Sequence, residues 1–352
     1  MNSPARYIMI GGFLCAGKTT AVAALAKHLT DLGQRGGLIT NDQGRELVDT
    51  RMLQSRIALP RMKFREGFCC KFNSLIDAAR RLTDQARPEV FIAEPVGSCT
   101  DLVATVTYPL RAQRILGLDE GAGFSERVLY IYKKQLEEAD IIVVSKRDLV
   151  EGDALEPLMA ALRKEFPGKR VLAVSAHDGA GLAEWFGILT SEDQVPRPAL
   201  EIDYDIYADA EALLGWLNAT LILESDDEVE SGTVLEALAT NIQRQLLAES
   251  AEVAHLKMTL TPDHGLNGEV AVINLVRNDF RPEFGQELEE PVTGAQIILN
   301  LRAEADPERL AAIVEHAVAT SAPAGCRLTL DHLERFRPGR PTPTHRDVAT
   351  VA

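Results

Sequence analysis

Long apolar runs, an N-terminal leader and paired cysteines are features that this sequence lacks. No run approaches the ~18 consecutive apolar residues of a transmembrane helix, so we expect no membrane span. The first apolar strand is expected already at 7–10, which leaves no room for a signal peptide before it. The five cysteines are odd in number and include the adjacent pair Cys69-Cys70, which does not suit a disulfide framework. We therefore expect a protein of the reducing cytoplasm.

Basic residues are also in deficit. Lys and Arg total 37 against 52 Asp and Glu, and the formal net charge is −15. Because a nucleic-acid backbone requires a basic face, this charge argues against nucleic acid as the main partner. It does not exclude nucleotides, which are bound by local amides, a lysine and a metal ion. The length of 352 residues predicts two domains, and 46% hydrophobic and 25% charged residues are typical of a globular protein.

The segment 12–19 reads Gly-Phe-Leu-Cys-Ala-Gly-Lys-Thr and fits the Gly-x4-Gly-Lys-Thr pattern of phosphate-binding loops. The apolar run at 7–10 predicts a buried strand before it, and apolar residues at helical spacing predict a helix over 19–32. The glycines let the backbone aim several N–H groups at one phosphate, and the helix N-terminus adds its positive dipole end. Lys18 is expected to reach the β- and γ-phosphates, and Thr19 to bind Mg²⁺. The expected nucleotide-binding residues here are Gly12, Cys15, Ala16, Gly17, Lys18 and Thr19 of this segment and Thr20 directly after it.

Acidic residues follow two further predicted strands. The strand 37–40 ends at Asn41-Asp42-Gln43-Gly44, and the strand 89–93 ends at Glu94. In open α/β sheets, ligands bind beyond the carboxyl ends of the strands. Asp42 and Glu94 are therefore candidate catalytic residues beside Lys18, and they would arrange Mg²⁺ or the attacking water. For Asp42 a solvated turn is an equally good interpretation, because Asn, Asp and Gly favour turns.

The strand predicted at 140–144 runs into Ser145-Lys146-Arg147-Asp148, a variant of the Asn-Lys-x-Asp motif that reads guanine. The aspartate accepts from the guanine ring N–H and amine, whereas adenine offers an acceptor where guanine offers a donor, and the lysine stem packs along the base. Ser145 replaces the usual asparagine, but the discriminating Asp148 is present. After a strand at 171–174, Ser175-Ala176 is expected to back the base through a main-chain N–H. This ordered set predicts GTP rather than ATP as the ligand.

The vicinal pair Cys69-Cys70 precedes a helix predicted at 72–83. Thiolates there would be stabilised by the helix dipole and by Lys71, which suits a soft-metal ligand. Free cysteines are also often buried as small hydrophobes, and a zinc site needs four ligands where only two stand here. The residues alone therefore favour packing over metal binding. The connection 51–66 lacks clear periodicity, and we expect it to be mobile with one short strand.

Pro196 and Pro198 mark a linker, after which the pattern changes. We expect a P-loop GTPase domain with a doubly wound, mainly parallel sheet over 1–194, a linker over 195–203, a smaller α+β domain over 204–337 and a disordered tail over 338–352. In the smaller domain we expect strands at 213–224, 255–261, 269–276, 295–301 and 326–333, an exposed acidic turn at 226–228, and helices at 233–247 and 307–319. This order suggests a ferredoxin-like fold with one additional strand. The histidines His255, His264, His316 and His332 lack ligand spacing and are expected to be structural.

Together these residues resemble the CobW-type GTPases, which are relatives of the urease and hydrogenase accessory GTPases. The resemblance covers both domains and is carried by 12–20, Asn41-Asp42-x-Gly44, Cys69-Cys70, Glu94, Ser145-Lys146-x-Asp148 and 336–341. It implies a domain that binds GTP·Mg²⁺ and hydrolyses GTP slowly, on the order of 10⁻⁴ to 10⁻² per second without a partner's arginine. It also implies a Cys-x-Cys-Cys motif that binds Zn²⁺ or another divalent transition metal, and a smaller domain that helps to choose a client metalloprotein.

Two cysteine positions depart from that family. Gly67 stands where the family has its first cysteine, so metal binding through Cys69 and Cys70 would need a further ligand, for which Cys15, Cys99 and Glu94 are candidates. Cys15 itself stands where the family usually has glycine. If that position requires positive φ, Cys15 strains the loop.

A third departure concerns the sheet. Between the strands at 89–93 and 140–144 the family has a further strand ending in aspartate, but 107–114 holds no apolar run of strand length. Residues 128–132 could substitute, although Ser125 as an N-cap and the apolar spacing behind it fit a helix better. We therefore expect either a sheet one strand short or a segment missing from the chain.

The sequence thus predicts a cytoplasmic GTPase that couples its nucleotide state to a zinc- or cobalt-type divalent metal and inserts that metal into a metalloenzyme, directly or through an assembly factor. The alternative is a GTP-driven regulatory or assembly switch for a partner enzyme, with the cysteines merely packed. A P-loop kinase of small molecules would need an acceptor pocket and a lid, for which the sequence offers no candidate. Homodimer formation stays open.

Overall fold

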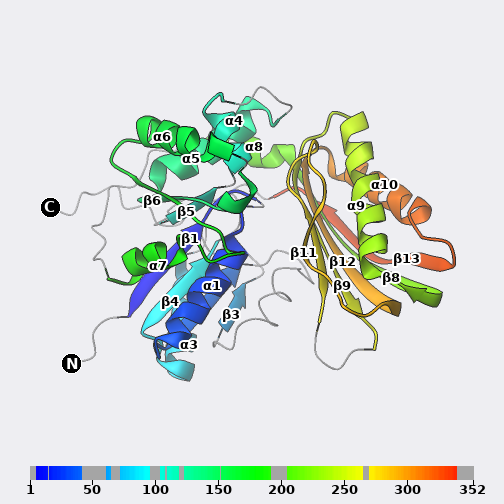
Figure 1. The fold of residues 1–352 in the computed structure, drawn as a ribbon, viewed down its shortest axis with the longest axis horizontal. Helices are drawn as coiled ribbons and strands as arrows, with labels where there is room; N and C mark the ends of the chain where they lie inside the picture. Colours follow the sequence, from blue (N-terminus) through cyan, green and yellow to red (C-terminus); the bar gives the residue numbers. More distant parts are fainter. Residues whose placement is uncertain are drawn as a thin grey trace.

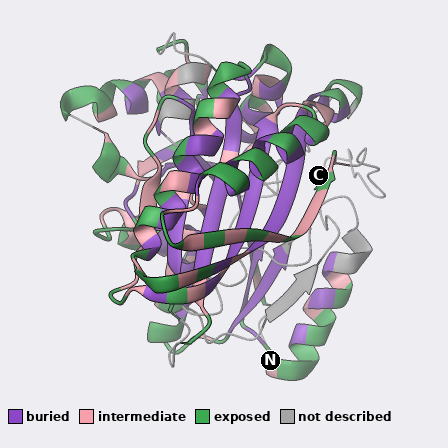
Figure 2. Cartoon of the chain, turned by 90° about the vertical axis from the view of Figure 1, so that its right-hand side faces the viewer, coloured by how far each residue is buried: buried purple, intermediate pink, exposed green. Residues whose placement is uncertain are grey.

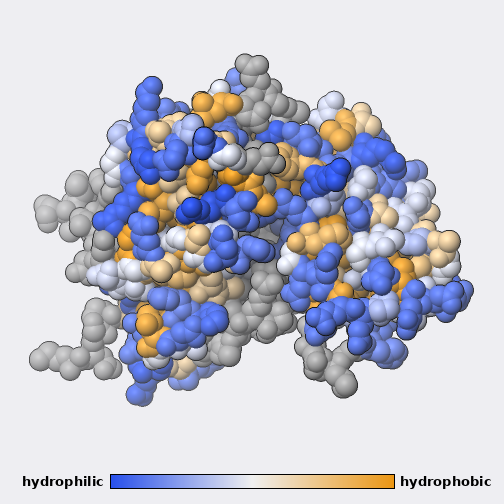
Figure 3. Space-filling view, in the orientation of Figure 1, coloured by the Kyte–Doolittle hydropathy of each residue, from blue (hydrophilic) through white to orange (hydrophobic). Residues whose placement is uncertain are grey.

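A computed structural model describes most of the chain as two sheets with helices packed on them (Figure 1). The described residues are 5–14, 16–41, 61–64, 72–95, 104–107, 109–118, 123–150, 152–191, 204–264 and 269–338. None of the helices in these ranges combines the length and apolar character needed to span a bilayer. Figure 3 shows hydrophilic side chains over much of one face of both halves, with smaller hydrophobic areas between them.

The N-terminal sheet has seven parallel strands in the order β3-β2-β4-β1-β5-β6-β7. Its strands are β1 (Arg6–Gly11), β2 (Gly36–Asn41), β3 (Arg61–Phe64), β4 (Val90–Glu94), β5 (Ala104–Thr107), β6 (Ile141–Val144) and β7 (Arg170–Ala173). Its helices are α1 (Lys18–Asp31), α3 (Phe72–Ala86), α4 (Pro109–Ile115), α5 (Glu126–Glu138), α6 (Leu155–Glu165) and α7 (Leu182–Ser191), and two short 3-10 turns are η1 (Arg147–Leu149) and η2 (Gly152–Ala154). The predicted doubly wound parallel sheet and the short strand within 51–66 are confirmed.

Alternation along the strands explains why both faces of this sheet are covered. Ile8 and Ile10 of β1 pack with buried residues of α1 and α7, whereas Met9 packs with those of α3 on the opposite face. On that opposite face, Ile142 of β6 packs with α5 and α6. Because a parallel sheet with helices on both faces buries both sets of side chains, polar groups can emerge only where its strands end.

The expectation of a sheet one strand short is wrong. Strand β5 lies between β1 and β6, with Ile10 opposite Ala104 and Thr105 opposite Ile142. The sequence hides this strand because only Val106 in its centre is a large apolar residue, while Thr105 and Thr107 are fully buried. The Thr107 hydroxyl is hydrogen-bonded to the hydroxyl of Tyr132, which offsets part of the cost of burying it. The helix predicted behind Ser125 is confirmed as α5.

The C-terminal sheet is antiparallel, with six strands in the order β11-β10-β9-β12-β8-β13. Its elements are β8 (Leu214–Val229), α9 (Ser231–Ala248), β9 (Val253–Pro262), β10 (Ala271–Leu275), β11 (Glu283–Gln286), β12 (Val292–Glu304), α10 (Pro307–Thr320) and β13 (Cys326–Phe336). The central order β9-β12-β8-β13, with α9 and α10 as crossovers, is the ferredoxin-like core that the sequence predicts. Two strands, β10 and β11, extend it rather than one, and β11 escaped prediction because it is a four-residue, partly exposed edge strand.

One predicted turn is wrong. Asp226, Asp227 and Glu228 are exposed as expected, but they continue β8, which runs on to Val229. Ser225 pairs with Cys326 of β13 and Val229 with Val292 of β12, so partner strands on both sides keep this segment extended. Acidic residues are accepted in this strand because its end projects into water.

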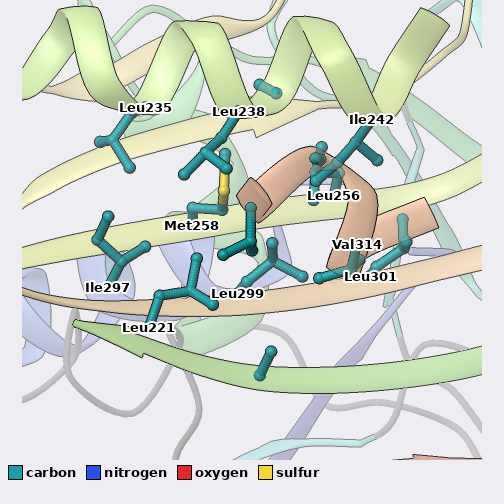
Figure 4. Close-up of a cluster of buried hydrophobic side chains, with 14 of the residues drawn as sticks. Leu221, Leu235, Leu238, Ile242, Leu256, Met258, Ile297, Leu299, Leu301 and Val314 are labelled. Atoms are coloured by element: carbon teal, nitrogen blue, oxygen red, sulfur yellow. The ribbon is translucent and has the colours of Figure 1, made fainter. Parts of the chain in front are cut away.

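Helices α9 and α10 cover one face of the C-terminal sheet and form its core with it (Figure 4). Leu221, Met258 and Leu299 point from three neighbouring strands toward Leu238 of α9 and Val314 of α10. Figure 2 shows most of the strands buried, whereas exposed residues lie on the helices, in loops and along the outer parts of some strands.

The segment after the expected linker forms a helix that the sequence did not predict. Helix α8 (Tyr204–Leu213) packs on α5 of the N-terminal domain, where Tyr207 and Ala210 bury Ile131. The chain then enters β8 directly. An apolar cluster joins the two domains next to this crossing and contains Phe13, Phe124 and Tyr132 together with Leu214, Trp216, Ala254 and Phe336.

Candidate functional site

The loop between β1 and α1 has the geometry of a phosphate cradle. Gly12 has φ +138°, and a Cβ placed there would lie 2.1 Å from the carbonyl oxygen of Val106 in β5. Gly17, with φ +87°, lies directly before the first residue of α1. Both positions therefore require glycine, one for close approach and both for backbone conformation. Cys15 lies outside the described residues, so the expected strain at that position stays a prediction.

Lys18 and Thr19 open helix α1 and are both buried. The Lys18 ammonium donates to the carbonyl oxygen of Phe13 at 3.0 Å, which folds the side chain over the loop. The Thr19 hydroxyl donates to Oε1 of Glu94 at 2.7 Å. Glu94 ends β4 and is 8% exposed. The fold thus brings together three residues that the sequence assigned to phosphate and Mg²⁺.

The groups gathered at the start of α1 have the chemistry needed to bind a phosphate and Mg²⁺, the two ligands that the motif implies. The unpaired N–H groups at the start of α1 and one ammonium suit an anion with several oxygens. A hydroxyl and a carboxylate at hydrogen-bond distance supply the hard oxygen ligands that Mg²⁺ prefers. Thr20, one residue further along α1, is partly exposed.

Ser145 ties the base-reading loop to the phosphate loop. The Ser145 hydroxyl donates to the carbonyl oxygen of Ala16 at 2.8 Å and lies 3.2 Å from the carbonyl oxygen of Thr107. The main-chain N–H of Ser145 also donates to the Thr107 carbonyl oxygen, at 2.9 Å. Serine at the position of the usual asparagine thus makes its bonds to main chain in two neighbouring loops. The role of Thr107 as acceptor was missed, because β5 itself was missed.

The residues after Ser145 are held in a tight turn. Lys146 has a left-handed backbone with φ +50°, and the N–H of Arg147 donates to the carbonyl oxygen of Val174 at 3.1 Å. Asp148 lies in the short turn η1 with its side chain exposed. The Lys146 ammonium donates to Oε2 of Glu283 in β11 at 2.8 Å, a contact between the two domains that the sequence did not indicate.

The loop after β7 is closed by its own hydrogen bonds. Ser175 is fully buried, and its hydroxyl oxygen accepts from the N–H groups of His177 at 3.2 Å and Asp178 at 3.3 Å. The N–H of Ala180 and the Ser175 hydroxyl hold the pKa of the Asp178 carboxyl below its usual value. Ala176 is left exposed at the tip of this loop, beside the turn that carries Asp148 along the same sheet edge.

Several predicted site residues fall outside the described residues. These are Asp42, Cys69, Cys70 and Cys99, together with Cys15 of the phosphate loop. Within the described ranges, no group of three or more His, Cys, Asp or Glu side chains is arranged to hold a metal ion. Cys326, the one cysteine described, lies in β13 with its thiol 3.4 Å from the Ser225 hydroxyl.

Comparison with known proteins agrees with this geometry. Residues 6–173 match the family model "CobW/HypB/UreG, nucleotide-binding domain". Probable GTPases of Mycobacterium tuberculosis and Mycobacterium bovis are 25% identical over 264 residues, covering 67% of this chain and 79% of theirs.

Solved structures to which this chain is similar include the hydrogenase maturation factor HypB of Archaeoglobus fulgidus, at 17% identity, TM-score 0.40 and coverage of 53% of this chain and 91% of that one. Another is the Zn(II)-bound YjiA GTPase of E. coli, at 14% identity, TM-score 0.37 and coverage of 92% and 100%. The family match spans the domain that holds the phosphate loop, Glu94 and the Ser-Lys-x-Asp turn, and it identifies residues 6–173 as a GTPase domain of the CobW type.

Proposed function

We propose that this GTPase couples its nucleotide state to the binding of a divalent transition metal and to delivery of that metal to a client metalloenzyme or its assembly factor. The nucleotide-binding part of this proposal rests on the hydrogen bond between Thr19 and Glu94 beside the phosphate loop. It joins the phosphate loop to Glu94 at the end of β4. A change at the phosphate can therefore be transmitted to the end of this strand.

The roles follow from the atoms present. Lys18 neutralises phosphate charge, the amides from Gly12 to Thr20 hold the phosphate oxygens, and Thr19 with Glu94 holds Mg²⁺, directly or through water. Mg²⁺, when bound, supplies positive charge that offsets the charge developing on the phosphates. Asp42 is proposed to orient the attacking water. We find no arginine finger among the candidates, so unassisted turnover is expected to be slow.

Asp148 is proposed to read guanine, with Lys146 along the base and Ser175-Ala176 behind it. Exchange of Asp148 for asparagine tests this assignment, because an amide can no longer accept from both guanine donors but can donate to the 2-oxo group of xanthine. Titration of the Asp148→Asn protein should show loss of GDP affinity and gain of xanthosine diphosphate affinity. Equal affinity of the wild-type protein for GDP and ADP would refute the guanine assignment.

Cys69 and Cys70 are the proposed transition-metal ligands, with Cys15, Cys99 or Glu94 as the candidate third. Their place between Asp42 and Glu94 in the sequence, and the metal binding that the family resemblance implies, support the proposal. Equilibrium dialysis with Zn²⁺ or Co²⁺, with and without GTP, tests it. Stoichiometric metal that is lost in a Cys69→Ser/Cys70→Ser variant is the expected result.

The second candidate is a GTP-driven assembly switch that transfers no metal. The glycine at position 67, where the family's first cysteine belongs, favours it. Under this alternative, dialysis finds no stoichiometric metal in either nucleotide state, while GTP still binds tightly.

The same proposal divides the chain into a GTPase domain over 1–194, a linker over 195–203, a client-recognition domain over 204–337 and a tail over 338–352. Helix α8 is the exception within this division, because it packs on α5 of the first domain.

A further inference from the structure

An ion pair links the base-reading loop to the other domain. The Lys146 ammonium lies 2.8 Å from Oε2 of Glu283, the first residue of β11. The two side chains are 29% and 33% exposed, so the pair is partly shielded from water. The partners lie 137 residues apart in the chain, and no local effect brings them together.

The main chain at both Lys146 and Glu283 is held in place by hydrogen bonds or strand pairing. On one side, Lys146 is set by the bonds of Ser145 to Ala16 and by the bond of Arg147 to Val174. On the other side, Glu283 pairs with Asn274 of β10, which in turn pairs with β9. With both main chains fixed, the direction of the Lys146 side chain depends on the group that holds its ammonium end.

Independent contacts hold the C-terminal domain on the same side of the nucleotide site. Phe13 of the phosphate loop is 1% exposed, stacks on Tyr132 and belongs to the apolar cluster shared with Trp216 and Phe336. The N–H of Ser125, before α5, donates to Oε2 of Glu304 in β12 at 2.9 Å. The second domain therefore shares an apolar cluster with Phe13 of the phosphate loop and also contacts the base-reading loop.

We propose that Glu283 is a positioning residue of the nucleotide site. By holding the ammonium end of Lys146, it keeps the lysine stem extended for packing along the base, and it makes docking of the C-terminal domain and binding of guanine nucleotide mutually dependent. This inference rests on the guanine site proposed above. Because coupling free energies are reciprocal, a nucleotide that is bound better by the docked form also strengthens docking.

The expected effect is modest, because a partly exposed ion pair contributes little in water. Loss of the pair should weaken GDP binding about two- to fivefold. Salt screens such pairs, so the difference should shrink between ~0.05 M and ~0.5 M NaCl. Removing a negative charge near an anionic ligand acts in the opposite direction, which makes the sign of the change informative.

The test is calorimetric titration of the full-length protein with GDP in Mg²⁺. Glu283→Gln is compared with Glu287→Gln, which removes the same charge from an exposed residue just beyond β11. A double-mutant cycle with Lys146→Met separates positioning from general charge, since Glu283→Gln should have no effect in the Met background. Weakening in Glu283→Gln alone is the expected result. Unchanged or tighter binding, or the same effect in the Met background, would overturn the proposal.

A second readout follows docking rather than affinity. Hydrogen–deuterium exchange of the β11 amides should slow when GDP is added to the wild-type protein, and this slowing should be lost in Glu283→Gln. If GDP binds the wild-type protein normally but does not change the exchange rates of the β11 amides, the proposed coupling between docking and nucleotide binding is wrong, while the guanine site itself is not affected. If the wild-type protein does not prefer GDP over ADP, the guanine assignment itself fails.

Discussion

The two sheets of this molecule place their polar residues in different ways. The parallel N-terminal sheet is covered on both faces, and its candidate functional groups stand at the ends of strands, as Glu94 does, or in the loops that follow them, as Gly12 and Ser145 do. The antiparallel C-terminal sheet has both helices on one face. On its other face, Asn218 donates to Glu334 at 2.8 Å and accepts from Asn300 at 3.1 Å, side by side across three strands.

This difference decides how visible the polar residues of each domain are in the sequence. A loop at a strand end needs only a few residues of defined type and spacing, so its function is visible as a motif. A polar row across a sheet draws one residue from each of several strands, and its members are scattered along the sequence. Backbone conformation restricts which residues the loops of the first domain accept, whereas packing volume restricts which residues the core of the second domain accepts. Substitutions of each kind can therefore test the two domains separately.

The largest effect is expected for Gly12→Ala. The new Cβ would meet the Val106 carbonyl oxygen at 2.1 Å in the middle of the sheet, and φ +138° is closed to alanine. We expect loss of at least ~3 kcal/mol of the folding free energy of the N-terminal domain. Urea unfolding followed by tryptophan fluorescence measures it, because Trp185 lies in α7 and Trp216 in β8.

The control for Gly12 is Gly33→Ala. Gly33 also has positive φ, +71°, but nothing lies within 4 Å of its Cβ position. Conformation alone should cost it about 1–2 kcal/mol. Equal destabilisation by the two substitutions would show that close approach to β5 is unimportant.

Lys18→Ala is expected to come next, with an effect on binding rather than on folding. Truncating a buried charged group that pairs with a charged ligand costs about 2–5 kcal/mol, which is at least ~30-fold in GTP affinity. Calorimetric titration with GTP in Mg²⁺ measures the loss. Lys27→Ala, on an exposed face of the same helix in a pair with Asp31, should bind as the wild-type protein does. Retained GTP affinity in Lys18→Ala would remove the phosphate loop from the site.

Local chemistry makes the candidate N-terminal site visible in the sequence. The proposed roles of the glycines, Lys18, Thr19 and the Ser-Lys-x-Asp turn depend on backbone conformation and short-range geometry that a motif records. The structure confirms the strand–loop–helix context and places Glu94 on Thr19. Asp148 and Ala176 follow their predicted strands, β6 and β7.

Tertiary partners explain what the sequence did not reveal. Strand β5 hides two fully buried threonines, and Thr107 depends on Tyr132, 25 residues later, for its hydroxyl partner. The partly exposed β11 has no alternating pattern to mark it. The pair of Lys146 with Glu283 depends on how two domains dock, which no local pattern encodes.

Leu238→Ala should affect the C-terminal domain alone. Leu238 is fully buried between α9 and the sheet, so its truncation leaves a cavity and should cost about 3 kcal/mol. The Trp216 transition should move to lower urea, while that of Trp185 and the GTP affinity of the folded protein should not change. Leu247→Ala, 48% exposed on the same helix, is the matched control. A parallel shift of both tryptophan transitions would mean that the two domains unfold as one unit.

The smallest effect is expected at Asp306, the N-cap of α10. Its carboxylate accepts from the N–H of Glu308 at 2.9 Å and from Arg337 at 3.0 Å, and these bonds hold the pKa of Asp306 below its usual value. A lowered pKa means that the stabilisation is fully present above the unfolded-state pKa of 3.8 and is lost as pH falls through the folded-state pKa. Asp306→Asn keeps an acceptor for the cap but lacks the charge, so it should unfold at slightly lower urea than wild type at pH 6, and this difference should be smaller at pH 3. Asp331→Asn, at an exposed aspartate of β13, corrects for the general loss of charge. If the gap between wild type and Asp306→Asn were as large at pH 3 as at pH 6, charge at this cap would not contribute to the stability of the C-terminal domain.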